Sequence, residues 1–347
     1  MLFTSCINKD KKVQTKEQTA AQLIKVDFSK EYKDRKFPNT NYSMTIQRLE
    51  DNEKYPIGYI DKLIVDDKRI YILDRSKAKS LFIYSRNGKF LHVINQTGRG
   101  PGEFSSLQDF DIDKTTGNIV IMDMGGNKFI FYSPEGKYIK ELKYDFMAVR
   151  FKLDNDNTIL MDNGNIPSED ASYYLKRMNI EGKSVSNIFP SDPSTIGITF
   201  NPRYPLQQYE NEIFYLPTLS NCIYALDGDE PRVVYQIDFG KNWPSKEFCE
   251  RIKSIHPLKI REFMFENNYV CFLNYIQTKD VLHLDFHKEK NYSFYYNKKT
   301  KQSLLVAMED ENISFPLATY NDEFIFVKYS EKTGLPIVVF YTVNFEL

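Results

Sequence analysis

Two segments of the chain repeat one another at a spacing of close to 50 residues. Residues 71–94 (YILDRSKAKSLFIYSRNGKFLHVI) and 120–142 (VIMDMGGNKFIFYSPEGKYIKEL) each contain a β-rich run that ends in aspartate, a polar break, a second run, a glycine turn and a third run. The two aspartates, Asp74 and Asp123, are 49 residues apart. A repeat of this length made of short strands is typical of a β-propeller, in which each repeat forms one blade around a central channel.

The repeat predicts an all-β fold with six blades. Hairpin signals such as Arg-Asn-Gly and Ser-Pro-Glu-Gly separate the runs within a repeat. An aromatic content of 15%, with 24 Tyr and 26 Phe, also favours strands. Counting repeats along the chain places the blades at 59–95, 107–143, 147–190, 206–240, 261–307 and 315–347. We therefore expect one six-bladed β-propeller over residues 23–347.

The ends of a propeller must be joined, because an unpaired outer strand is an open edge. The segment before the first blade contains two alternating stretches, LIKVDFS at 23–29 and YSMTIQRL at 42–49. The chain ends on a complete strand pattern, PIVVFYTVNFEL. We expect the N-terminal segment to supply a strand that closes the last blade.

The first residues indicate a membrane anchor. MLFTSC resembles the lipobox of bacterial lipoproteins, in which Cys6 would carry the lipid, although Phe3 stands where the lipobox prefers Leu and most of the preceding signal is missing. Residues 1–22 are then a lipobox remnant and a flexible polar tether. Either the start is assigned too late, or the sequence keeps only the tail of the signal, or Cys6 is an ordinary cysteine. The lipobox implies a place in the cell envelope, at the outer membrane or in the periplasm, with the lipid as the one contact to the membrane.

One unit of the chain resembles a known repeat. Residues 94–139 contain a glycine-rich turn, Phe104, a strand to Asp113, a hairpin at Gly117-Asn118 and a closing strand, in the pattern of an NHL repeat. The whole chain is similar to the six-bladed β-propeller lipoproteins of Bacteroidetes, in which turns like GRGPGEF are frequent. That resemblance implies the architecture, and it implies no common activity and no catalytic residues.

The glycine-rich turn QTGRGPGEF, at 96–104, is interpreted as a connection between the outer strand of one blade and the inner strand of the next. A phosphate-binding loop would need Gly-Lys-Ser/Thr or a third glycine that opens a helix, whereas a further strand follows here. Arg99 and Glu103 suit either an ion pair that pins the turn or contact with a ligand at the mouth of the channel.

Three aspartates hold equivalent positions at strand ends: Asp74, Asp123 and Asp162. Propeller symmetry would bring them to similar heights around the axis, where a ring of carboxylates could hold calcium. The alternative, which we favour, is that each accepts hydrogen bonds from backbone N–H groups of its own turn. Arg75 could reach a carboxylate or phosphate of a ligand. No cofactor other than calcium is expected.

Two segments interrupt the repeat. Residues 187–210 include four prolines and predict a long loop between the third and fourth blades, on which Arg203, Tyr204 and Tyr209 would offer charge and stacking surface to a ligand. Residues 241–267 have a helical pattern, and a helix there could cap one mouth of the channel.

The chemically capable side chains do not form a recognisable catalytic set. His283 and His287 lie in a predicted strand, where positions four apart are roughly 13 Å from one another, so we expect a surface pair rather than a metal site. Cys222, Cys249 and Cys271 lack metal-ligand spacing. We assign no catalytic residue.

The charge balance narrows the function. Lys plus Arg is 46 and Asp plus Glu is 47, so no positive field exists for general nucleic-acid binding. The favoured hypothesis is a monomeric, lipid-anchored module that binds or scaffolds an envelope protein, peptide or glycan. The alternative is an NHL-like propeller enzyme, a lyase or hydrolase, with a site at the channel mouth. An intracellular interaction module is the least favoured, because of Cys6.

Overall fold

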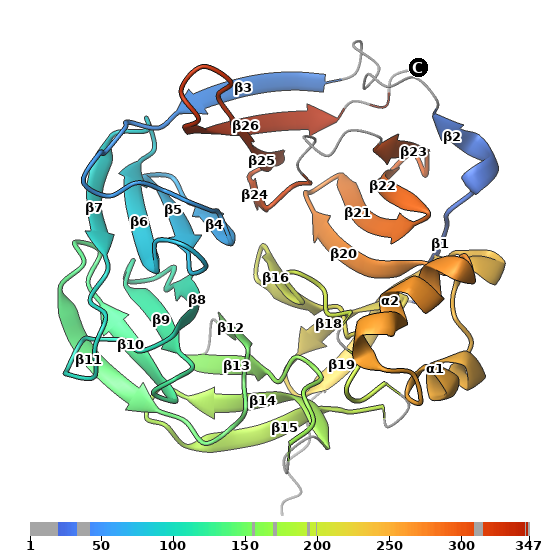
Figure 1. Cartoon of the computed structure of the whole chain (residues 1–347), viewed down its shortest axis with the longest axis horizontal. Coiled ribbons are helices and arrows are strands. Elements are labelled where there is room, and N and C mark those ends of the chain that lie inside the picture. The colour runs from blue at the N-terminus through green and yellow to red at the C-terminus, as the bar shows by residue number, and fades with distance from the viewer. Residues whose placement is uncertain are drawn as a thin grey trace, which may run out of the picture.

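The computed structural model describes residues 20–32, 42–154, 157–168, 172–192, 195–198, 200–308, 315–343 and 345. These residues form six antiparallel sheets arranged in a ring, each with its first strand nearest the centre (Figure 1). The expected all-β six-bladed propeller is confirmed.

The first three blades contain four strands each. The first contains β4 (Lys62–Val65), β5 (Arg69–Asp74), β6 (Ser80–Ser85) and β7 (Phe90–Ile94). The second contains β8 (Leu107–Ile112), β9 (Ile119–Asp123), β10 (Lys128–Tyr132) and β11 (Tyr138–Lys143). The third contains β12 (Arg150–Leu153), β13 (Thr158–Asp162), β14 (Tyr173–Asn179) and β15 (Ser184–Pro190).

The other three blades are completed by strands from the N-terminal segment. The fourth contains β16 (Leu206–Tyr209), β17 (Glu212–Tyr215), β18 (Cys222–Asp227), β19 (Glu230–Asp238) and β1 (Gln22–Lys25). The fifth contains β20 (Cys271–Gln277), β21 (Val281–Lys288), β22 (Lys290–Asn297), β23 (Ser303–Met308) and β2 (Glu31–Tyr32). The sixth contains β24 (Ala318–Tyr320), β25 (Glu323–Tyr329), β26 (Pro336–Val343) and β3 (Tyr42–Arg48).

The core lies between the blades. Each blade buries both faces against its neighbours, which is why the second strands β5, β9 and β13 are almost continuous apolar runs. An apolar cluster fills each of the six interfaces between adjacent blades. Between the first and second blades, for example, Tyr71 packs against Phe110 at 6.5 Å between ring centroids.

The N-terminal segment closes the ring, as the sequence predicts. The strand β3 pairs antiparallel with β26, from Tyr42 opposite Val343 to Arg48 opposite Ile337. The earlier stretch at 23–29 does not join this blade. Instead β1 adds in parallel to β19 of the fourth blade and β2 to β23 of the fifth, with the short 3₁₀ helix η1 (Phe28–Lys30) between them. The segment therefore runs along the outer edges of three consecutive blades.

The predicted helical segment forms two helices, α1 (Lys246–Ile252) and α2 (Pro257–Glu266), after a second 3₁₀ helix, η2 (Gly240–Asn242). The side chain of Ser245 accepts a hydrogen bond from the N–H of Phe248 and so begins α1. The expectations of a channel cap and of a fifth blade starting at 261 are both wrong. Figure 1 shows the helices at the rim, beside the fourth and fifth blades. Their apolar face packs against Phe200 and Cys271, which leaves the fifth blade to begin at Cys271.

Among the described residues, no helix is long and apolar enough to cross a membrane.

The closing strand can be tested by truncation. Removing residues 1–49 leaves β26 with a free edge and the sixth blade with three strands, so we expect a large fall in Tm or loss of a cooperative unfolding transition. Thermal unfolding followed by circular dichroism measures this. A chain that lacks residues 1–19 keeps all the strands described here and serves as the control. An unchanged Tm in the longer truncation would show that the ring does not depend on β3.

Candidate functional site

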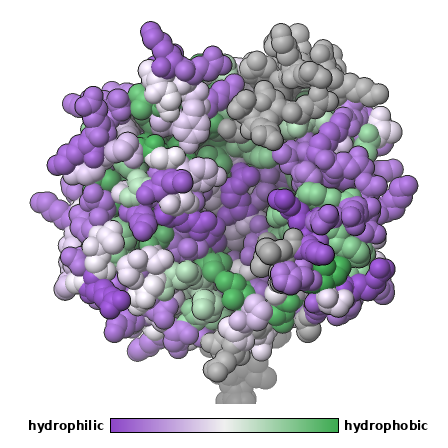
Figure 2. Space-filling model, viewed as in Figure 1, coloured by the Kyte–Doolittle hydropathy of each residue, from purple (hydrophilic) through white to green (hydrophobic). Residues whose placement is uncertain are grey.

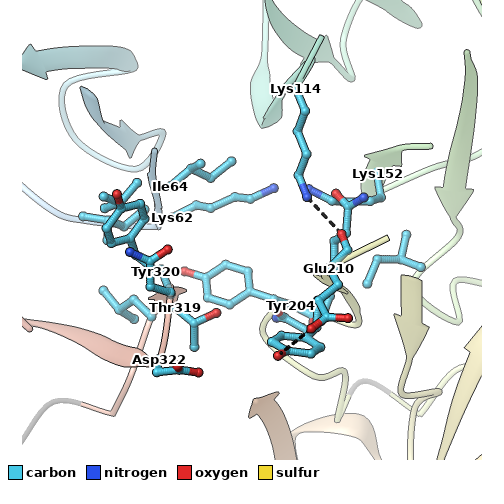
Figure 3. Close-up of a pocket in the computed structure, with 18 of the residues that line it drawn as sticks. Lys62, Ile64, Lys114, Lys152, Tyr204, Glu210, Thr319, Tyr320 and Asp322 are labelled. Atoms are coloured by element: carbon cyan, nitrogen blue, oxygen red, sulfur yellow. Dashed lines mark hydrogen bonds between the residues drawn. The ribbon is translucent and has the colours of Figure 1, made fainter. Parts of the chain in front are cut away.

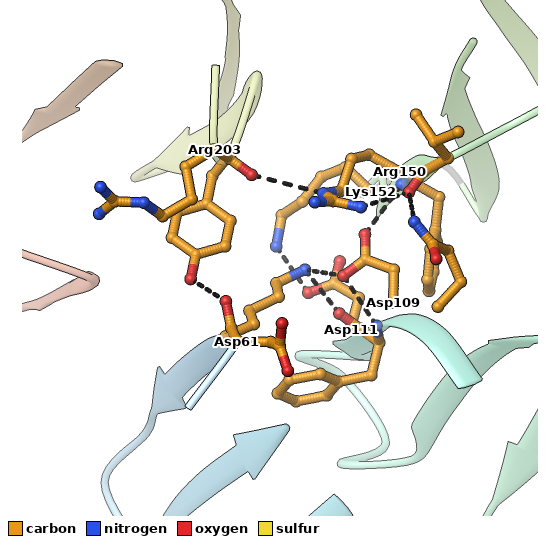
Figure 4. Close-up of polar contacts among 12 residues, drawn as sticks. Asp61, Asp109, Asp111, Arg150, Lys152 and Arg203 are labelled. Carbon is orange, nitrogen blue, oxygen red and sulfur yellow. Dashed lines mark hydrogen bonds and ion pairs between the residues drawn. The ribbon is translucent and has the colours of Figure 1, made fainter. Parts of the chain in front are cut away.

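A tyrosine from the loop between the third and fourth blades crosses the centre of the ring. The loop ends just before β16, and the Tyr204 hydroxyl donates a hydrogen bond to the carbonyl of Asp61, which precedes β4 (Figure 4). The fourth and first blades face one another across a six-bladed ring, so the phenol ring spans the channel. Burial of this phenol raises the pKa of Tyr204. The loop therefore supplies a floor to the channel.

The residue before Tyr204 ties the same loop to two further blades. The backbone N–H of Arg203 donates to Asn274 of β20 at 2.5 Å, and its guanidinium group lies 3.8 Å from Asp285 of β21. The carbonyl of Arg203 accepts from Arg150 of β12 at 3.4 Å. Contacts to the first, third and fifth blades hold the floor in place.

A cavity of about 640 Å³ lies between Tyr204 and the turns that follow the inner strands. Its lining comes mostly from the first, fourth and sixth blades, with single residues of the second, third and fifth. Figure 2 shows that mostly hydrophilic residues surround the hollow at the centre of the face in view. Its polar lining includes Lys62, Lys114, Lys152, Tyr209, Glu210 and Thr319.

Three lysines from three consecutive blades point into this cavity and toward one another (Figure 3). Lys62 of β4 lies 2.8 Å from the carboxylate of Asp109, and Lys152 of β12 lies 2.7 Å from that of Asp111. Both aspartates belong to β8 and are buried. Burial alone would raise the pKa of Asp111, but the charges of Lys152 and Lys62 outweigh it and lower that pKa. The carboxylate of Asp111 is therefore held in its ionised form by these two ammonium groups.

Lys114 has a different environment from the other two lysines. It lies in the turn after β8, and its ammonium group donates to the backbone carbonyl of Glu210 at 3.4 Å. Loss of surrounding water, and then the positive charge of Lys152, lower the pKa of Lys114. This ammonium group is therefore less well stabilised than those of Lys62 and Lys152.

The opposite wall of the cavity carries aromatic and acidic groups. The hydroxyl of Tyr209 donates to the Glu210 carboxylate at 3.1 Å, and burial together with that contact raises the pKa of Tyr209 to about 12. Tyr320 donates to Asp67 at 2.6 Å and so stands fixed at the rim. The cavity thus has a basic wall on the first three blades and an aromatic, partly acidic wall across from it.

The glycine-rich turn lies between β7 and β8, as predicted, and its acidic residue is used internally. The carboxylate of Glu103 accepts from the N–H of Gly100 at 2.8 Å and packs so close to Gly98 that a side chain there would collide with it. Position 102 has a φ of +73°, a backbone conformation that favours glycine over other residues. Arg99 is exposed, and no ion pair between described residues joins it to Glu103. Neither residue lines the channel cavity.

The three equivalent aspartates all serve their local turns. Asp74 accepts from four backbone N–H groups, those of Gly58, Tyr59, Lys77 and Ala78. Asp123 accepts from the N–H groups of Ser105 and Ser106. Asp162 accepts from the Tyr215 hydroxyl and the N–H of Gly164, and burial raises its pKa to about 6. No set of three or more His, Cys, Asp or Glu side chains in the described part of the chain is arranged to hold a metal ion.

Other candidates lie away from the cavity. Arg75 donates through Nε to Asp61 at 3.0 Å and through its N–H to the same carboxylate. His283 contradicts the expected surface pair, because it is fully buried between the fifth and sixth blades, 3.1 Å from the Ser293 hydroxyl. Burial lowers its pKa to about 3. His287 is partly buried and stacks on Phe265 of α2, at 4.1 Å between ring centroids.

Of the sequence candidates, the structure brings Tyr204 and Tyr209 into the cavity, and Arg203 supports its floor. The lysines were missed because they belong to three separate repeats. The sequence does contain a signal, since Lys62 begins the otherwise apolar inner strand β4 and Lys152 stands between Phe151 and Leu153 in the inner strand β12. Reading the first strand of every repeat together would have selected them.

Comparison with known proteins identifies the family. The sequence profile of a family described as "6-bladed beta-propeller", DUF5128, matches residues 14–328. The chain belongs to the DUF5128 family. Among curated proteins, none matches the chain significantly.

Solved structures agree with the DUF5128 fold. A protein of Bacteroides fragilis named "Putative exported protein" is 14% identical, with a TM-score of 0.77 over 94% of this chain and 100% of its own. A member of the duf4221 family from Bacteroides vulgatus is 9% identical, with a TM-score of 0.54 over 86% of this chain and 96% of its own. At these identities the likeness shows the fold alone.

The role of Asp74 is open to a direct test. Asp74→Ala leaves four backbone N–H donors without this acceptor, so we expect the free energy of unfolding to fall by about 3 kcal/mol in urea titrations. Asp51→Ala, at an exposed position, is the control and should change it by less than about 0.5 kcal/mol. A chelator that destabilised the unmutated protein by as much as Asp74→Ala does would contradict this role. It would show that Asp74 stabilises the fold by binding a cation.

Proposed function

We propose that the chain is a binding module of the cell envelope, anchored by lipid on Cys6, and that it takes a peptide, glycan or protein segment into the mouth of its channel. The observation that carries this proposal is the cavity of about 640 Å³ above the Tyr204 floor. Cavities of this size, with a few fixed polar groups, are the usual sites for ligands.

The rigidity of the site supports a binding role. Tyr204 and its neighbour Arg203 are tied to three blades, and Lys62 and Lys152 are held by buried aspartates. A ligand therefore meets groups that are already in position, so that little conformational entropy is lost when it binds. Propellers offer such a site without any need for catalytic groups.

The envelope location rests on two observations. The stretch MLFTSC resembles a lipobox, although Cys6 lies outside the residues that the structure describes. The Bacteroides fragilis protein with the same fold is named as exported. The NHL-like pattern at 94–139 agrees with a propeller used for recognition.

The cavity can be blocked to test the proposal. Thr319→Trp places an indole at the cavity wall, and Thr333→Trp, in an exposed turn between β25 and β26, is the matched control. We expect a panel of peptides and oligosaccharides, neutral and charged, to include ligands that raise the Tm of the unmutated chain and of Thr333→Trp but not of Thr319→Trp. Differential scanning fluorimetry measures the shift.

Equal increases in Tm in both variants would show that the ligands bind outside the channel. Mass spectrometry of the same mixtures tests the enzyme alternative, because a lyase or hydrolase would convert a panel member into products.

The anchor is tested separately. In a bacterial host that processes lipoproteins, the chain preceded by a complete lipoprotein signal should incorporate an alkyne-labelled fatty acid and fractionate with membranes. Cys6→Ser should abolish both, because the thiol is the attachment point, whereas Cys222→Ser should abolish neither. Membrane association of Cys6→Ser would refute the lipid anchor.

A further inference from the structure

A second cavity adjoins the channel cavity and shares lining residues with it. A cavity of about 260 Å³ lies on the turns of the second and third blades, and both Lys114 and Gln208 line it as well as the channel cavity. Lys114 therefore stands at the junction of the two cavities. An extended ligand could occupy both and pass directly over this ammonium group.

Lys114, at the junction, carries a positive charge that no carboxylate of the described residues pairs with. Lys62 and Lys152, which point toward it, each have a buried aspartate of β8. Among the ion pairs of the described residues, none includes Lys114, and its hydrogen bond goes to a neutral carbonyl. The pKa of Lys114 is lowered, because water loss and the charge of Lys152 disfavour its charged form more than the Asp111 carboxylate favours it. An anionic group of a ligand would supply the missing partner.

Apart from their charged side chains, the two linings contain many groups that suit a ligand rich in hydroxyl groups. Amide and hydroxyl side chains that can both donate and accept hydrogen bonds are present in both cavities: Gln207, Gln208 and Thr319 in the first, and Thr115, Asn118 and Asn157 in the second. The rings of Tyr204 and Tyr209 add flat apolar surface in the first. Hydroxyls spaced along an extended chain, with a carboxylate carried by a sugar unit, are the chemistry of an acidic oligosaccharide.

We propose that the two joined cavities bind an acidic oligosaccharide, with Lys114 binding the carboxylate of a sugar unit at their junction. This inference rests on the proposed function and specifies its ligand. The neighbouring sugar units lie toward the Tyr204 floor on one side and toward the turns of the second and third blades on the other.

Isothermal titration calorimetry tests the proposal with the full chain and a matched pair of probes, a trimer of galacturonic acid and its fully methyl-esterified form. We expect the acid to bind at least about tenfold more tightly than the ester, because the ester cannot pair with Lys114. Lys114→Gln should weaken binding of the acid at least about tenfold and leave binding of the ester unchanged. Lys137→Gln, an exposed lysine outside both cavities, makes the same change in net charge and should leave both affinities unchanged.

Three results would overturn the inference. Equal affinity for the acid and the ester would show that the charge of the ligand does not contribute to binding. Tighter binding of an acidic peptide, triglutamate, than of the acid trimer would show that the ligand is a peptide and not a sugar. Failure of the acid trimer to bind would reject the ligand class, while the proposed binding function would still stand if Thr319→Trp blocked other ligands. A circular dichroism spectrum and Tm like those of the unmutated chain establish that Lys114→Gln is folded.

Discussion

The antiparallel pairing of β3 with β26 is the contact on which the rest of the structure depends. An apolar cluster fills each of the six interfaces between adjacent blades, so each blade is stable only if it has a neighbour on both sides. Pairing residues 42–48 with the last strand turns six such interfaces into a closed ring. The two preceding strands extend the same segment along the fourth and fifth blades, where Ile24 and Val26 enter the core.

A closed ring makes the centre a place where distant residues meet. The buried aspartates of β8 lie between lysines of the blades on either side, and Tyr204 reaches from the fourth blade to the first. These polar contacts are favourable there because each buried carboxylate has an ammonium partner and backbone donors as well. The result is a cavity with a rigid floor and with Lys114, whose ammonium group contacts only a neutral carbonyl among the described residues. These two features are the basis of the proposed recognition.

Much of the fold was predictable because its signals are local. Alternation, hairpin turns and the spacing of Asp74 and Asp123 locate five of the six blades closely. The fifth blade begins at Cys271 and not at 261, because residues 257–266 are helical. The roles of Asp74 and Asp123 were predictable in the same way, since their hydrogen bonds lie within their own turns or an adjacent one, whereas Asp162 also accepts one from Tyr215 of the fourth blade. His283 was misjudged because alternation shows that a strand has two faces but does not show that a neighbouring blade covers both.

The sequence by itself determined the number of blades, their order, the closing segment and the place of the long loop, because strand period, turn chemistry and repeat length are all encoded within about 50 residues. The tertiary structure alone decided which side chains share the channel. Lys62, Lys114 and Lys152 are about 50 and 40 residues apart along the chain and belong to different blades. They meet because ring closure places the inner strands of successive blades side by side around one axis, a relation that no local pattern contains.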